Sequence, residues 1–318
     1  MGAKQELWEY FMNHTSGRRS LKGAVHGIIA FTMDADDEII DLILKRLKRS
    51  EITFVESSGA YFDYSRKELH FPYKITPSHR STALHEMGHA VDFISCECTK
   101  ERVNEHRTRT VYKEHCCSVE KKLTGGKTLA EIVRAELKQK SAEIYDFLQG
   151  QFKCEVLDKL GEDTAVKFLS ANERLTKDDE LKIKHRVPRF TLDEYKSDRA
   201  RIDELCRIRD SLTLSYDERF NLFEVRKGVT GSSEYRKFQE KYDILLDMIS
   251  GVYNTKYLWC GHSRSYMKRK GGFGVEFFAD VFSAIATRNE ENLCSASKLL
   301  HKSYAAYEEV FEYLKSAE

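Results

Sequence analysis

Apolar and charged positions recur at helical spacing through most of the first 50 residues. The clearest case is residues 34–49, which begin with acidic side chains and end with Lys45, Arg46, Lys48 and Arg49. Because acids favour the positive end of a helix and bases the negative end, this pattern predicts a helix. The stretch just before it, residues 27–32, is apolar and fits either a short strand or a buried turn.

Residues 51–74 have a different pattern, rich in β-branched and aromatic side chains. Three short strands are expected here, and residues 65–67 are expected to form the turn between the last two. The prediction is a small antiparallel sheet directly before the next helix. Its edge strand would either hold an extended peptide by backbone hydrogen bonds or be a plain structural hairpin.

Residues 96–250 are mostly helical by pattern, most clearly at 128–149 and 196–212, and Pro188 divides the region into two blocks. The chain has only 3 Pro and 17 Gly, and 32% of its residues are charged. Together these features predict an α+β fold that is predominantly α, with a large helical segment after the sheet.

The segment Ser81–Phe93 carries the sequence HEMGH at residues 85–89. On a helix, His85 and His89 lie one turn apart on the same face, so both imidazoles reach one ion, and Glu86 lies beside them. The apolar positions Leu84, Met87, Val91 and Ile94 form a separate face, and Thr76-Pro77 is a plausible start for this helix. The pattern predicts one zinc ion with Glu86 as general base.

A third ligand is predicted in residues 275–286, which are apolar almost all round. Glu276 and Asp280 lie on one polar stripe of this expected helix, and a buried carboxylate needs a cationic partner. We assign Glu276 as the ligand and Asp280 as the acid that orients a ligating histidine. The alternatives are that Glu276 pairs with an arginine or lysine, or that the two acids exchange roles. Asp92 either orients a histidine, which we prefer, or is itself a ligand.

His262 and Tyr266 precede Glu276 and are the two candidates for stabilising an oxyanion during peptide hydrolysis. Either side chain can equally serve packing or lie at the surface. Their closeness to Glu276 in the sequence is the reason for naming them.

The charge and composition of the chain limit the classes of protein to which it can belong. Lys+Arg 52 and Asp+Glu 51 give a net charge of +1, which offers no bulk attraction for nucleic acid. The chain contains no apolar run long enough to span a membrane and no signal-peptide pattern at its start, so we expect synthesis in the cytoplasm. The eight cysteines show no framework spacing and are expected to be reduced.

The two motifs HEMGHAVD and EFFADVF resemble those of the gluzincin-type zincin peptidases. They are most similar to the catalytic domain of anthrax lethal factor and to the clostridial proline–proline endopeptidases. Residues 261–282 also resemble zincin domains of phage minor head or structural proteins and of bacterial toxin-like cassettes. The resemblance implies zinc ligands His85, His89 and Glu276, the base Glu86 and a supporting acid at Asp280.

The chain also differs from the lethal-factor pattern at two positions. Arg269 stands where the lethal-factor pattern has an oxyanion tyrosine, and Asp280 replaces that family's glutamate. The resemblance implies a zincin domain in two halves, residues 1–95 and 251–318, with 96–250 as a helical insertion. A zinc metalloendopeptidase acting on a peptide or protein is the expected function. The alternatives are a phage structural or interaction protein that keeps the scaffold, associated with a virion, and an effector protease delivered to a host to cut one host protein.

Overall fold

The computed structural model describes residues 2–16, 21–32, 35–72, 80–104, 107–175, 216–253, 262 and 264–317. The chain divides into two compact units, and helices α6 and α13 each run from one unit into the other. The first unit contains Met1–Ile144, Lys241–Tyr253 and Gly261–Glu318, and the second contains Tyr145–Glu240 and Asn254–Cys260. The predominantly helical α+β class predicted from the sequence is confirmed. The expected helix over 196–212, Pro188 and the helix start at Thr76-Pro77 lie outside the described residues.

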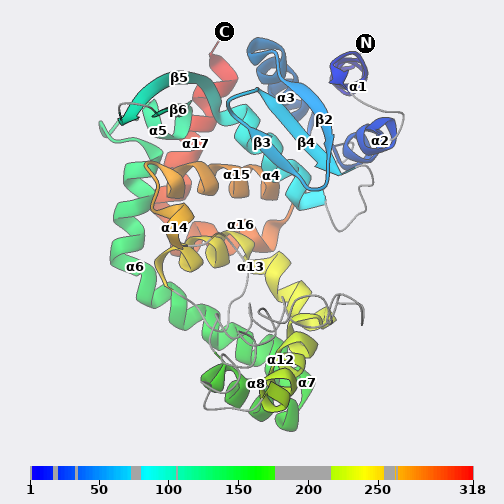
Figure 1. Cartoon of the computed structure of the whole chain (residues 1–318), viewed down its shortest axis with the longest axis vertical. Helices are drawn as coiled ribbons and strands as arrows, with labels where there is room; N and C mark the ends of the chain where they lie inside the picture. Colours follow the sequence, from blue (N-terminus) through cyan, green and yellow to red (C-terminus); the bar gives the residue numbers. More distant parts are fainter. Residues whose placement is uncertain are drawn as a thin grey trace. The chain divides into compact units, whose positions relative to one another are not determined.

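The first unit is built from helices around a small sheet (Figure 1). Its helices are α1 (Ala3–Asn13), α2 (Leu21–Thr32), α3 (Asp37–Ser50), α4 (Arg80–Asp92), α5 (Cys117–Glu120), α14 (Arg264–Met267), α15 (Gly272–Ala286), α16 (Glu290–Leu299) and α17 (His301–Ser316), with the start of α6 (Leu129–Phe152) and the end of α13 (Ser233–Val252). Residues 27–32, for which the sequence allowed a strand or a turn, belong to α2.

The sheet is mixed, which corrects the prediction of an antiparallel one. Its strands are β1 (Thr15–Ser16), β2 (Thr53–Ser57), β3 (Tyr61–Asp63) and β4 (Glu68–Pro72), in the order β1-β2-β4-β3. Only the β3–β4 hairpin is antiparallel, with the predicted turn, whereas β2 runs parallel to both β1 and β4. β3 is therefore an edge strand.

One face of this sheet packs into the core. Phe54, Leu69 and Phe62 occupy one register row across β2, β4 and β3, and all three are buried. Phe11 of α1 stacks on Phe54 with ring centroids 4.1 Å apart, and Phe62 meets Phe93 edge-on. Phe93 directly follows α4, and β3 also packs against this helix.

The region predicted as a helical insertion begins instead with a long hairpin, β5 (Phe93–Asn104) paired with β6 (Arg107–Cys116). Most of its side chains are exposed on both faces, so it lacks the alternating apolar positions that mark a half-buried strand. The helical part of the region that the structure describes starts at α5, and the boundary of the second unit falls at residue 145 rather than 96.

In the second unit, helix α6 continues through a π-helical turn, Lys153–Leu157, and α7 (Asp158–Leu160). Helices α8 (Glu162–Arg174) and α12 (Tyr216–Thr230) pack against each other, and α13 begins here. Phe152 lies at the centre of its core, within 5.6 Å of the ring of Phe168 and 5.5 Å of that of Phe238. Among the described residues, no helix is long and apolar enough to cross a membrane.

Candidate metal centre

Helices α4 and α15 supply the centre of the site, and they lie side by side in the first unit (Figure 1). Helix α15 is buried along nearly its whole length, as its continuous apolar sequence predicts. It starts after Gly271, whose φ of 79° is the left-handed conformation that glycine adopts without strain. Helix α4 ends where the buried Arg46 donates hydrogen bonds to the carbonyl oxygens of Val91 and Phe93.

Gly88, inside the HEMGH motif, allows the two helices to approach closely. A Cβ atom at residue 88 would lie 2.8 Å from Cα and 3.2 Å from the carbonyl oxygen of Ala279 in α15. Ala279 is adjacent to Asp280 and three residues from Glu276. The small residue therefore sets the distance between the histidines of α4 and the carboxylates of α15.

We expect Gly88→Ala to weaken zinc binding and lower the unfolding temperature. The added Cβ meets backbone atoms that cannot rotate away, and such overpacking typically costs about 1–3 kcal/mol. Gly150→Ala in α6 is the matched control, because a Cβ there meets nothing within 4 Å and is expected to stabilise the helix by up to about 1 kcal/mol. Thermal unfolding and zinc titration of both variants check this, and an unchanged Gly88→Ala protein would contradict it.

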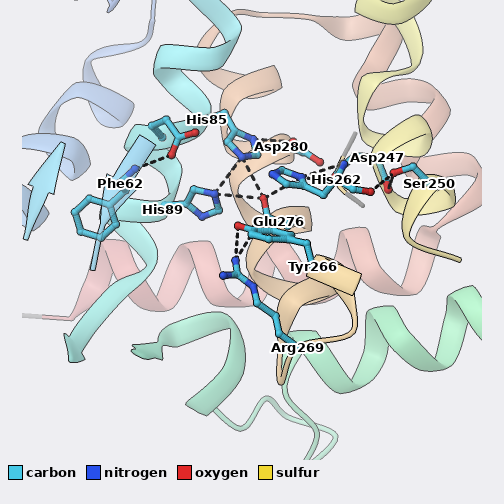
Figure 2. A network of polar contacts seen from close by, with 11 residues as sticks. Phe62, His85, His89, Asp247, Ser250, His262, Tyr266, Arg269, Glu276 and Asp280 are labelled. Atoms are coloured by element: carbon cyan, nitrogen blue, oxygen red, sulfur yellow. Dashed lines mark hydrogen bonds and ion pairs between the residues drawn. The ribbon is translucent and has the colours of Figure 1, made fainter. Parts of the chain in front are cut away.

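Three potential ligand atoms converge between α4 and α15 (Figure 2). The Nε2 atoms of His85 and His89 are 3.1 Å apart, and they lie 3.2 and 3.3 Å from Oε2 of Glu276. Zinc binds such atoms at about 2.0–2.1 Å, so two ligand atoms of a tetrahedral site lie roughly 3.3 Å apart. The triangle of ligand atoms therefore has the dimensions of one face of a zinc tetrahedron.

The contacts of Glu276 Oε2 support the same interpretation. This oxygen is buried and makes no hydrogen bond, although two imidazole nitrogens lie within 3.3 Å. Burial by itself would raise the pKa of Glu276, but the facing rings of His89 and His85 hold it well below its usual range. A cation bound by both rings would satisfy an oxygen in this position.

Asp280 lies one turn beyond Glu276 and contacts His85 from the other side of the ring. Its Oδ1 is 2.8 Å from His85 Nδ1, so Nε2 of that ring is directed at the shared point. Although burial lowers the pKa of His85, the charge of Asp280 and its hydrogen bond raise it well above the ordinary value. This is the contact expected of an acid that orients a metal ligand.

Asp92 is also buried, but it does not make the contact that the sequence suggested. Its two carboxylate oxygens accept hydrogen bonds from the backbone N–H and the hydroxyl of Ser118. Burial raises the pKa of Asp92 to about 6, against the lowering effect of Ser118. Asp92 thus fixes the end of α4 to α5, and its side-chain hydrogen bonds go to neither His85 nor His89.

Glu86 is held by the edge strand of the sheet. The backbone N–H of Phe62 donates a hydrogen bond of 2.9 Å to Glu86 Oε2. This contact joins the predicted general base to the strand on which we expect an extended peptide to align. The Phe62 N–H was not recognisable from the sequence, because a backbone donor carries no residue signature.

Glu276 Oε1 faces a phenol and a guanidinium. Tyr266 donates a hydrogen bond of 2.8 Å to this oxygen, and Arg269 contacts it at 3.0 Å while covering the Tyr266 ring. Burial and the charge of Glu276 raise the pKa of the Tyr266 phenol. The two oxygens of the Glu276 carboxylate therefore have different partners. Oε2 faces the histidines, as a metal ligand would, and Oε1 contacts Arg269, as the alternative of an arginine partner predicted.

His262 lies on the far side of the same carboxylate. Its ring stacks on Tyr266 with centroids 4.4 Å apart and lies 6.0 Å from the ring of His85. Its Nδ1 is 3.1 Å from Oδ1 of Asp247, a buried residue of α13, and hydrogen bonding to Asp247 raises the pKa of His262 although burial lowers it. The His262 side chain is 34% exposed, so the site opens to solvent here.

Asp247 was missed by the sequence analysis, although a signal was present. It is the single charged residue in the apolar run Leu245–Ile249, the same pattern that identified Glu276 in α15.

No protein-family model, curated protein or solved structure matches this chain. The function is therefore argued from the geometry of the site.

Proposed function

We propose that the protein is a zinc-dependent metallopeptidase whose ion is held by His85, His89 and Glu276. The observation that carries the proposal is the triangle of ligand atoms with 3.1–3.3 Å edges around a buried Glu276 oxygen that has no hydrogen bond. Two imidazoles and one carboxylate leave the fourth position of a tetrahedral ion open, as catalytic zinc requires. A site that only stabilises the fold would close that position with a fourth protein ligand.

A bound zinc ion would supply a polarised scissile carbonyl and a water molecule of lowered pKa. With such an ion bound, Glu86 would be the base that accepts a proton from the water and later the acid that protonates the departing amine. The Phe62 N–H holds one Glu86 oxygen, so the carboxylate is oriented before substrate arrives. Because β3 is an edge strand, an extended peptide that pairs with it would lie beside this base.

The contacts of Tyr266 and His262, the two oxyanion candidates, indicate different roles for the two side chains. The Tyr266 hydroxyl donates to Glu276 Oε1 and accepts from Arg269, so we assign it to orienting the ligand carboxylate. His262 is fixed by Asp247 through Nδ1 and is partly exposed at the mouth of the site. We therefore assign His262 as the donor that stabilises the oxyanion.

The test is cleavage of mixed peptide libraries by the purified protein, with new N-termini identified by sequencing. We expect defined cleavage products that disappear after chelation and return with one equivalent of zinc. Chelation is also expected to leave the fold largely intact, because the surrounding core is apolar and independent of the ion. A protein that binds zinc, unfolds on chelation and cuts no peptide would instead be a scaffold with a structural ion.

A further inference from the structure

A second group of potential ligands lies beside the proposed zinc ligands. One atom each from Asp247, His262 and Glu276 all lie within 4.8 Å of one another. They come from α13, from a position two residues before α14 and from α15, and they follow one another across the site (Figure 2). Asp247 and Glu276 are only 4% and 0% exposed, whereas His262 is partly exposed, so the two carboxylates lie in the interior and the imidazole lies between them and solvent.

The two distances from the His262 ring are similar to those in the first group, and the Asp247 and Glu276 oxygens lie within 4.8 Å of each other. His262 Nδ1 is 3.1 Å from Asp247 Oδ1 and 3.5 Å from Glu276 Oε2. These values bracket the roughly 3.3 Å expected between two ligands of a small divalent ion. The shared atom is Glu276 Oε2, which is buried and makes no hydrogen bond in either group.

Asp247 accepts hydrogen bonds from the backbone N–H and the ring of His262, whereas two neighbouring carboxylates each have one oxygen without a hydrogen bond. A third carboxylate, Asp280, is 6% exposed, and its Oδ2 is buried without a hydrogen-bond partner. Arg269 contacts the other oxygen of Glu276, Oε1, and its hydrogen bonds do not reach Asp247 or Asp280. Carboxylates taken out of water need a cation or several hydrogen bonds to offset the loss of hydration.

We propose that Asp247, His262 and Glu276 form a second divalent-cation site that shares Glu276 Oε2 with the zinc site. In known two-metal sites the ions lie about 3.5–4 Å apart, a separation that two ions sharing one oxygen can adopt. The mixed oxygen and nitrogen ligands suit Zn²⁺, Co²⁺ or Mn²⁺. The proposal rests on the proposed function in one respect, the bridging role of Glu276.

Loading of the two sites is expected to be sequential. The first offers two imidazoles and a carboxylate, whereas the second offers one imidazole, one carboxylate and an oxygen that is already shared. A cation on His262 Nδ1 also replaces the proton that this atom otherwise donates to Asp247. We therefore expect the second ion to bind at least about ten times more weakly than the first.

The experiment is calorimetric titration of the metal-free full chain with Co²⁺, followed by electron paramagnetic resonance. Wild type is expected to bind two equivalents in two steps, and the second is expected to reduce the signal by spin coupling. Asp247→Asn keeps an oxygen that accepts the His262 backbone N–H and is expected to bind one equivalent. Asp243→Asn, one turn earlier on α13, removes the same charge without removing a ligand and is expected to bind two.

His262→Phe tests the site independently, because it retains a ring to stack on Tyr266 and removes Nδ1. It is expected to bind one equivalent. A wild type that binds one equivalent, lost in His89→Ala and kept in Asp247→Asn, overturns the second site and leaves the zinc proposal standing. One equivalent lost in Asp247→Asn but kept in His89→Ala supports the Asp247 site and overturns the zinc site. A wild type that binds no Co²⁺ overturns both.

Discussion

Replacing Glu86 by glutamine is expected to lower kcat by about 100- to 10,000-fold while the protein still binds zinc. The amide has the same shape and its oxygen can still accept the Phe62 N–H, so the local geometry is retained. It cannot take a proton from water, which is the role assigned to Glu86. The measurement is peptide cleavage together with the zinc content of the same preparation.

Glu97→Gln is the matched control, because Glu97 lies on the exposed hairpin strand β5 and its side chain is 58% exposed. This variant is expected to cleave like the wild type. If Glu86→Gln cleaved peptides at the wild-type rate with zinc bound, Glu86 would not be the base. If it lost both zinc and activity, its role would be structural rather than chemical.

Replacing Glu276 by glutamine is expected to reduce zinc affinity by more than about 100-fold. The change removes a ligand and the negative charge that offsets the ion, and it leaves the Arg269 guanidinium facing a neutral amide. Residues that only orient a ligand typically account for about 10- to 100-fold in metal affinity. Competition with a fluorescent zinc chelator measures the affinity over this range.

Asp280→Asn is expected to lower zinc affinity less than Glu276→Gln does, so the two variants are compared directly. Asp280→Asn keeps an acceptor for His85 Nδ1 but loses its charge, so a 10- to 100-fold loss of zinc affinity is expected. The order of affinities should be wild type, then Asp280→Asn, then Glu276→Gln. A Glu276→Gln protein with wild-type affinity would mean that the carboxylate serves only as the partner of Arg269.

Two features of the candidate site could be predicted from the sequence. The spacing of His85 and His89 places both rings on one helix face whatever the rest of the chain does, because the rise and turn of a helix are fixed locally. A carboxylate in an apolar helix needs a partner on energetic grounds, which led to Glu276. Both inferences depend on short segments and simple chemistry.

Three features of the structure were not predicted from the sequence, each for a different reason. The β5–β6 hairpin lies in a polar sequence whose side chains are exposed on both faces, so its strands carry no periodic apolar signal. The parallel pairing of β2 with β4 arises because β4, and not β3, lies beside β2, which the composition of the strands does not encode. Asp247 meets His262 across fifteen residues of sequence through the packing of α13.

The sequence by itself determined the helical character of the chain, the helix that carries HEMGH and the need of Glu276 for a cationic partner. Only the tertiary structure decided which groups meet at the two oxygens of that carboxylate: imidazoles at one, and a phenol and a guanidinium at the other. The physical reason is the close approach of α4 and α15 at Gly88. Local spacing fixes which side chains share a helix face, whereas the contact between helices is fixed by packing along the whole interface.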